Sequence, residues 1–168
     1  RQFDAKTIIR ITADCPLIDS QVVDRTVEAF FGKTTRFDYL LSQDDQREAL
    51  PNFQTDTPYD FAANRLPPPF GRTYPIGLDT EVCTFEALET AWTEAREKHQ
   101  REHVMPFFYD NLDRFRVLLV NHEKDYGSLR WTVDTPEDLE AVRRIFAAFP
   151  GRDDFSWLEV LKLFKEHP

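Results

Sequence analysis

The stretch RITADCPLID, residues 10–19, follows the apolar run Thr7–Ile11 and ends it within a few residues. A strand there cannot continue through Pro16, because proline has no backbone N–H to donate to a sheet. Asp14 therefore stands where a buried strand gives way to a loop, and Asp19 is placed to cap the helix that follows. Ligands of open α/β sheets bind beyond the carboxyl ends of the strands, so Asp14 is either a turn residue or part of a site.

Strand-like and helix-like segments alternate along the rest of the chain. The helix after Asp19 is expected to end at Gly32 and to carry on one face Val22, Val23, Val27, Phe30 and Phe31. Further strands are expected at residues 37–41, 58–66, 78–84, 115–123 and 129–134. Further helices are expected at Phe85 to about Lys98, at His103–Asn111, after the cap Thr135, and after the capping box of Ser156 and Glu159. This alternation predicts an α/β protein with a mixed, mostly parallel sheet flanked by helices.

Two of the later helices have an apolar face of their own. The first carries Leu88, Ala91, Trp92 and Ala95. The second is expected to bury Leu139, Val142, Ile145, Phe146 and Phe149. The length of 168 residues is that of one domain, so residues 1–168 are expected to form a single α/β domain. Residues 43–57, QDDQREALPNFQTDT, are polar and aperiodic, which predicts a mobile insertion with few core contacts.

Composition excludes several classes of partner. Acidic residues outnumber basic ones 30 to 21, and the net charge of −9 argues against a nucleic-acid polymer or an anionic membrane. The two cysteines have no metal-ligand spacing, and no window approaches the roughly 20 apolar residues of a membrane span. A cytoplasmic setting is therefore expected.

Asp14 and Asp134 occupy matching sequence contexts. Each follows an apolar strand-like run, and each precedes a proline by two residues. Two carboxylates at neighbouring strand ends suit Mg²⁺, which one or two carboxylates hold together with substrate phosphates. They would then lie within about 6 Å of each other, or one water molecule further. The alternative is that both residues only start helices or turns.

Four segments together resemble the spore-coat-polysaccharide type of sugar cytidylyltransferase. They are RITADCPLID, NRLPPPFGRTYPIGLDTEVCTFEALETAW, QREHVMPFFY and LRWTVDTPEDLEAVRRI. That family is similar to the synthetases of CMP-activated Kdo and sialic acids. The resemblance implies a nucleotide-diphospho-sugar transferase-like fold, related to GT-A and Rossmann folds, and transfer of CMP from CTP to a sugar for surface polysaccharide synthesis. It also implies that Asp14 and Asp134 are catalytic and hold Mg²⁺.

Other residues are candidates to contact the substrate. Asp79 and Glu81 alternate in GLDTEV, so they share one face of a strand, where burial requires water, a cation or sugar hydroxyls. The alternative is that this face belongs to a solvent-facing edge strand. The full candidate set is Arg10, Thr12, Asn64, Arg72, Tyr74, Asp79, Glu81, Glu102 and His103. The expected partners are CTP and a small sugar, with a nonulosonic-type acid as one candidate, and a homodimer is a further expectation.

The segment HQREH offers a weaker alternative. His99 and His103 stand four residues apart with Glu102 between them, which matches the H-x-x-E-H pattern of a zinc hydrolase. The segment is a polar helix end soon interrupted by Pro106, which disfavours a zinc site.

A phosphate-binding loop is missing from the sequence pattern. The five glycines, Gly32, Gly71, Gly77, Gly127 and Gly151, form neither a G-x-G-x-x-G nor a G-x-x-x-x-G-K cradle. In the resembled family that loop precedes the ADCPLI segment, so the chain is expected to correspond to the C-terminal two-thirds of the enzyme, without the N-terminal nucleotide-binding portion. Residues 1–168 alone are then expected neither to bind CTP tightly nor to form a CMP-sugar. The alternative is a non-catalytic relative that acts as a binding or assembly module.

Overall fold

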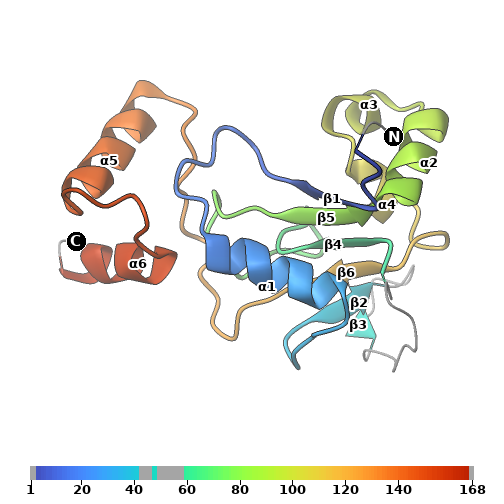
Figure 1. Ribbon diagram of the computed structural model, residues 1–168, viewed down its shortest axis with the longest axis horizontal. Helices are drawn as coiled ribbons and strands as arrows, with labels where there is room; N and C mark the ends of the chain where they lie inside the picture. The colour runs from blue at the N-terminus through green and yellow to red at the C-terminus, as the bar shows by residue number, and fades with distance from the viewer. Residues whose placement is uncertain (1–2, 42–46, 49–58, 167–168) are drawn as a thin grey trace.

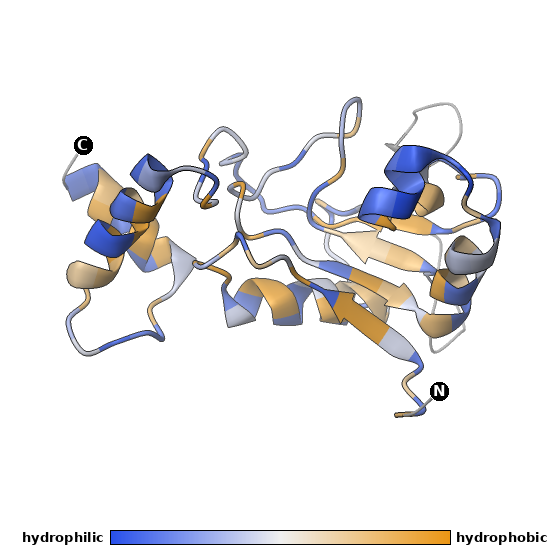
Figure 2. Cartoon of the chain, turned by 90° about the horizontal axis from the view of Figure 1, so that it is seen from above, coloured by the Kyte–Doolittle hydropathy of each residue, from blue (hydrophilic) through white to orange (hydrophobic). Residues whose placement is uncertain are grey.

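The structure, a computed structural model, describes residues 3–41, 47–48 and 59–166 (Figure 1). Its centre is one sheet of six strands in the order β1-β5-β4-β6-β2-β3. The strands are β1 (Thr7–Arg10), β2 (Tyr39–Leu41), β3 (Arg47–Glu48), β4 (Phe61–Ala63), β5 (Glu81–Thr84) and β6 (Val117–Leu119). The hydrophobic colour of Figure 2 runs along the central strands, as expected for a sheet covered on both faces.

The prediction of a mixed α/β sheet is confirmed, but its emphasis on parallel pairing is wrong. Among the strands that the structure describes, β4 and β6 are parallel, whereas the other four neighbouring pairs are antiparallel. The reason lies partly in residues 64–80, which connect β4 to β5 without a helix. A parallel neighbour needs a long crossover connection, whereas this segment turns the chain back beside β4.

Helices cover the two faces of the sheet separately. Helix α1 (Ser20–Phe30) packs on one face, in a core of Ala29, Phe30, Tyr59, Ala62, Val82, Leu118 and Val120. Helices α2 (Phe85–Glu94), α3 (Lys98–His103) and α4 (Pro106–Tyr109) lie on the other face. There the core includes Phe61, Ala63, Cys83, Ala87, Phe107, Phe108, Val117 and Leu119. Strand side chains thus alternate between α1 and the group α2–α4.

The last two helices build a third core beside the sheet. Helices α5 (Pro136–Ala147) and α6 (Trp157–Glu166) lie at the far end from α2–α4 in Figure 1. Their apolar side chains meet residues from earlier in the chain, in a cluster of Leu17, Val22, Tyr74, Leu78, Trp131, Ile145, Trp157, Val160 and Leu161. The C-terminal helices therefore pack through this apolar cluster against the loops that follow the strands.

The predicted helix caps are confirmed. Asp19 accepts hydrogen bonds from the backbone N–H groups of Gln21 and Val22, and Gly32 follows the end of α1 with a φ of +92°. Thr84 caps α2. Thr135 and Asp138 form a reciprocal capping box at α5. Side chain and backbone contacts of Ser156 and Glu159 form another at α6.

Three predicted helix features are wrong. The helix from Phe85 stops at Glu94, and the segment expected at His103–Asn111 is split between α3 and α4. Val104, with a φ of +66°, ends α3, and Pro106 is the first residue of α4, because proline lacks the N–H that a continuing helix would need. Three side chains expected on apolar faces are exposed: Phe31 at 45%, Leu139 at 39% and Trp92 at 69%.

The strand expected at residues 129–134 is reduced to a single bridge between Ile76 and Arg130. Its neighbour is the irregular segment around Gly77, which has a φ of +105°. A Cβ atom at Gly77 would lie 2.9 Å from the backbone carbon of Trp131, so this close approach requires glycine. Residues 43–57, predicted as an insertion, lie outside the described residues apart from β3.

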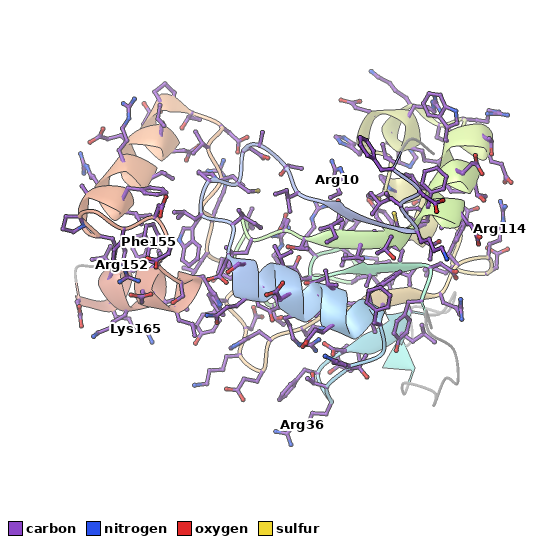
Figure 3. All side chains as sticks on the ribbon, in the orientation of Figure 1. Arg10, Arg36, Arg114, Arg152, Phe155 and Lys165 are labelled. Carbon is purple, nitrogen blue, oxygen red and sulfur yellow. The ribbon has the colours of Figure 1, made fainter. Side chains whose placement is uncertain are left out.

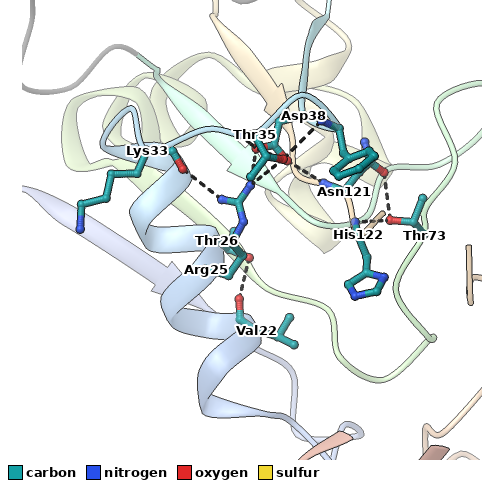
Figure 4. Close-up of polar contacts among 10 residues, drawn as sticks. Val22, Arg25, Thr26, Lys33, Thr35, Asp38, Thr73, Asn121 and His122 are labelled. Carbon is teal, nitrogen blue, oxygen red and sulfur yellow. Dashed lines mark hydrogen bonds and ion pairs between the residues drawn. The ribbon is translucent and has the colours of Figure 1, made fainter. Parts of the chain in front are cut away.

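A buried ion pair fixes the connection from α1 to β2 (Figure 4). Asp38, whose side chain is 0% exposed, is paired with Arg25 of α1. The same carboxylate accepts hydrogen bonds from the backbone N–H groups of Thr35 at 2.7 Å and Asn121 at 2.9 Å. Asp38 therefore joins α1, the start of β2 and the end of β6.

Candidate functional site

The loop after β1 brings Asp14 beside the segment that contains Asp134. The backbone N–H of Val133 donates to the carbonyl oxygen of Asp14 at 2.9 Å. A hydrogen bond from Thr12 lowers the pKa of the half-buried Asp14 carboxyl, so it stays ionised at neutral pH. The two chain segments therefore meet as the sequence predicts, whereas the predicted distance between the carboxyl groups stays a prediction.

The carboxylate of Asp134 is already engaged. It is paired with Arg130 and accepts a hydrogen bond from the Thr132 hydroxyl at 3.1 Å. Arg130 also donates to Asp138 at 2.9 Å, so it keeps a second partner if Asp134 turns toward a cation. Mg²⁺ binds oxygen ligands, so the carboxylates of Asp14 and Asp134 on adjoining segments are suitable ligands for it.

Glu81 and Arg10 form a pair across neighbouring strands. The register of β1 and β5 places the two residues opposite each other, and Figure 3 labels the Arg10 side chain on β1. Glu81 is 7% exposed, and this burial raises its pKa, while Arg10 acts in the opposite direction. The partly exposed Arg10 guanidinium thus stabilises the charge of the buried Glu81 carboxylate at the edge of an apolar core.

A second ion pair lies just upstream of β5. Arg72 donates two hydrogen bonds to Asp79, at 2.7 and 3.3 Å, in a forked arrangement. Asp79 acts electrostatically on Glu81, which places the two carboxylates near each other as GLDTEV predicts. The structure pairs each of the two predicted acids with its own arginine, and their contact with a substrate stays a prediction.

Arg65 and Tyr109 complete this group of side chains. The positive charge of Arg65 acts electrostatically on both Glu81 and Tyr109 and opposes the rise in the pKa of each that burial causes. Burial raises the pKa of Tyr109 to about 12, so its hydroxyl stays protonated. Neither the Arg65 side chain nor the Tyr109 hydroxyl has a hydrogen-bonded partner among the residues that the structure describes.

A cavity of about 560 Å³ opens beside Tyr109. Its other lining residues are Pro67, Pro68, Pro69, Phe70, Asp110, Leu112 and Asp113. We call Arg10, Arg65, Arg72, Asp79, Glu81 and Tyr109 the β5-edge site; of these residues, Tyr109 also lines the cavity. Tyr109 was missed from the sequence, and the only signal was its place at the end of the resembling segment QREHVMPFFY.

Four predicted substrate contacts are not among the residues of the β5-edge site. The buried amide of Asn64 is used by the backbone of Leu78 and Thr80, at 2.7 and 2.8 Å. Tyr74 is buried against Trp157 in the third core. Glu102 and His103 are exposed on α3.

In the part of the chain that the structure describes, the residues of the H-x-x-E-H pattern do not form a metal site. His99 is paired with Asp110 at 2.8 Å. Within residues 3–41, 47–48 and 59–166, no three His, Cys, Asp or Glu side chains gather as a metal site. A pair of carboxylates such as Asp14 and Asp134 would need additional oxygen ligands from substrate or water.

The comparison with solved structures shows which known protein shares this fold. The solved structure of a cytidylyltransferase from Leptospira borgpetersenii superposes with a TM-score of 0.75 and is 27% identical, over 99% of this chain and 59% of that chain. The chain shares its fold with a cytidylyltransferase. The predicted nucleotidyltransferase-like fold is therefore confirmed.

Two curated proteins are similar in sequence. An uncharacterized protein of Methanocaldococcus jannaschii is 32% identical over 141 residues, which cover 82% of this chain and 45% of that protein. The spore coat polysaccharide biosynthesis protein SpsF of Bacillus subtilis is 23% identical over 164 residues, 96% of this chain and 55% of that protein. The chain thus spans about half the length of the curated relatives it matches. No family model matches the chain, and none of its described helices is long and apolar enough to cross a bilayer.

Proposed function

We propose that these residues form the metal- and sugar-binding part of an enzyme that transfers CMP from CTP to a sugar for surface polysaccharide synthesis. The main support is the β5-edge site, where Arg10 is paired with Glu81 and Arg72 with Asp79. Arg65 acts electrostatically on Glu81 and on Tyr109, and Tyr109 lines a cavity. The similarity to the Leptospira cytidylyltransferase and to SpsF supports the reaction class. CTP and a small sugar are the partners in this proposal.

The reaction joins a sugar hydroxyl oxygen to the α-phosphorus of CTP. The bond from that phosphorus to its bridging oxygen breaks, pyrophosphate leaves and the hydroxyl proton is released. Asp79 and Glu81 accept hydrogen bonds from sugar hydroxyls and so orient the attacking oxygen. Arg10 and Arg72 hold these two carboxylates in position, because each is already paired with one of them.

Asp14 and Asp134 would hold Mg²⁺, whose charge would stabilise the phosphate oxygens during transfer. Asp14 suits this role because its pKa is lowered and its carboxylate is ionised at neutral pH. Asp134 would exchange Arg130 for the cation, while Arg130 keeps Asp138.

The sugar in this proposal carries an acidic group. Arg65 and the Tyr109 hydroxyl have no partners among the described side chains, and a carboxylate between them would satisfy both. This arrangement favours an acidic sugar of the nonulosonic type over a neutral sugar.

The test is pyrophosphate release from CTP and Mg²⁺ by the protein purified from its source, with a panel of acidic and neutral sugars. Turnover is expected with an acidic sugar, and the Asp14→Asn variant should lower kcat about a hundredfold or more, the scale of one lost electrostatic contact. The 168-residue chain alone is expected to be inactive. Turnover by that chain would place the phosphate-binding groups within it, whereas no turnover by the source protein with any sugar would favour the non-catalytic module.

A further inference from the structure

Asp79 lies between the two parts of the candidate site. Its side chain is 24% exposed, so a ligand can reach it. Its negative charge acts electrostatically on Glu81 in the β5-edge site and on the thiol of Cys15, the neighbour of Asp14. The position of Asp79 would therefore decide how a sugar at the β5-edge site is presented to the proposed metal site.

The backbone on both sides of Asp79 is held by one buried side chain. Asn64 is 0% exposed and directly follows β4. Its Nδ2 atom donates to the carbonyl oxygen of Leu78 at 2.7 Å, and its Oδ1 atom accepts from the backbone N–H of Thr80 at 2.8 Å. Because Leu78 and Thr80 are the chain neighbours of Asp79, the amide of Asn64 sets where the Asp79 side chain leaves the backbone.

The carboxylate of Asp79 is held through Arg72 and Gly127. Arg72, 15% exposed, binds this carboxylate with both ends of its guanidinium, at 2.7 and 3.3 Å. A Cβ atom at Gly127 would lie 2.7 Å from the Arg72 carbonyl oxygen and 2.8 Å from the Arg72 Cγ atom. The backbone of Gly127 lies outside the left-handed region, so the close approach to Arg72, and not its φ, requires glycine.

The loop that carries Gly127 is held against the segment that follows the arginine. The backbone N–H of Tyr126 donates to the carbonyl oxygen of Thr73 at 2.8 Å, and the N–H of Ile76 donates to the carbonyl oxygen of Leu129 at 2.8 Å. These bonds lie on either side of Gly127, so the loop can make room for a side chain only by breaking them. A methyl group at position 127 would therefore displace the arginine rather than the loop.

We infer that Asn64 and Gly127 are positioning residues that hold Asp79 for the sugar, an inference that rests on the proposed function. Asn64 sets the backbone of Asp79, and Gly127 sets its carboxylate through Arg72. Polar groups that are ordered in advance avoid the cost of being ordered when a ligand binds. The sequence predicts Asn64 as a substrate contact, whereas here it acts through Asp79.

The first test compares the kinetics of the source protein with those of its Gly127→Ala variant. The variant should raise the KM for the sugar about tenfold or more and keep the KM for CTP within about twofold, because Asp79 is proposed to contact only the sugar. Asn64→Ala should show the same split between the two substrates. Ser128→Ala is the matched control, since Ser128 is exposed in the same loop, and both KM values should be unchanged.

A double-mutant comparison separates positioning from a general loss of stability. In an Asp79→Ala background, which already lacks the carboxylate, Gly127→Ala should raise the KM for the sugar by less than about twofold further. An equal rise in both backgrounds, or no rise in the native background, would overturn the inference. The proposed function would stand in either case, because the native protein would still turn over the sugar.

A crystal structure of the Gly127→Ala variant provides a readout that needs no turnover. The two Arg72–Asp79 contacts, 2.7 and 3.3 Å in the native chain, should lengthen beyond the hydrogen-bond limit of about 3.5 Å. Retention of both contacts would overturn the inference whether or not the protein is active. An opened pair in a protein whose native form turns over no sugar would instead overturn the proposed function, and with it the role of these residues in sugar binding.

Discussion

At the residue scale, the arginines of the β5-edge site differ in their partners. Arg10 and Arg72 form ion pairs within the protein, whereas Arg65 is the arginine proposed to bind a ligand. Arg10 is paired with Glu81 and Arg72 with Asp79, so both carboxylates have a partner before substrate arrives. Arg65 has no such partner among the described residues and lies near the protonated Tyr109. An acidic ligand can therefore bind Arg65 without breaking an existing ion pair, which avoids the cost of leaving a charge unpaired.

The Arg25–Asp38 pair should be a stability determinant at this scale. Asp38→Ala removes a carboxylate that is 0% exposed and leaves two backbone N–H groups without an acceptor. Arg25, 22% exposed, loses its charged partner and keeps only hydrogen bonds to the Lys33 carbonyl and the Thr35 hydroxyl, at 3.3 and 3.4 Å. We expect the free energy of unfolding to fall by roughly 3–5 kcal/mol, the scale for breaking one partner of a buried pair. Urea unfolding followed by circular dichroism measures this change.

The Glu28–Lys33 pair of the same helix region is the control for Asp38. Its side chains are 52% and 71% exposed, so Glu28→Ala should leave the urea midpoint within experimental error. An equal loss of stability in both variants would mean that burial does not decide the effect at Asp38.

At the scale of the element, local signals were predictable and pairings were not. The caps at Asp19, Thr84, Thr135 and Ser156 were identified from the sequence, because each bond closes within a few residues. The strand predicted at residues 129–134 does not form, because a strand needs a neighbouring strand to pair with. The segment beside it is an irregular turn around Gly77.

The α6 capping box should respond to acid. Arg152, together with the backbone and hydroxyl of Ser156, lowers the pKa of Glu159 to about 2, from an ordinary value of 4.5. A carboxyl with a depressed pKa contributes stability above its ordinary pKa and loses that contribution as the pH falls toward the folded value. The stability difference between the native protein and Glu159→Gln should therefore be largest above pH 4.5 and shrink toward about pH 2.

Urea midpoints of both proteins across this pH range test the expectation, and the glutamine keeps the capping geometry without titrating. A difference that stays constant down to about pH 2 would show that the charge of Glu159 is not involved.

At the scale of the whole molecule, the candidate site depends on strand register. Arg10 and Glu81 are 71 residues apart and meet because β1 and β5 pair in one register. The sequence predicts that Asp79 and Glu81 share a face, but not which arginine pairs with each, because the register of β1 and β5 is set between segments far apart in the chain. Tyr109 joins from α4 for the same non-local reason.

Asp19 links the two ends of the molecule through one buried carboxylate. One oxygen accepts from Gln21 and Val22 at the start of α1, and the other accepts from the backbone N–H of Trp157 at 2.7 Å, 138 residues away. Asp19→Asn keeps one acceptor oxygen and replaces the other with a donor. The variant can therefore cap α1 but leaves the buried N–H of Trp157 without its partner.

The expected result of Asp19→Asn is local opening of α6 rather than loss of the sheet. An unsatisfied buried donor costs about 1–3 kcal/mol, which corresponds to roughly fivefold to 150-fold faster hydrogen exchange. The amides of Trp157 and Val160 should exchange faster by this factor, while those of β5 change little. Asp24→Asn, an exposed carboxylate on α1, is the matched control and should alter neither group. Equal acceleration in α6 and β5 would instead mean that Asp19 stabilises the whole fold cooperatively, and that the C-terminal helices have no separate opening.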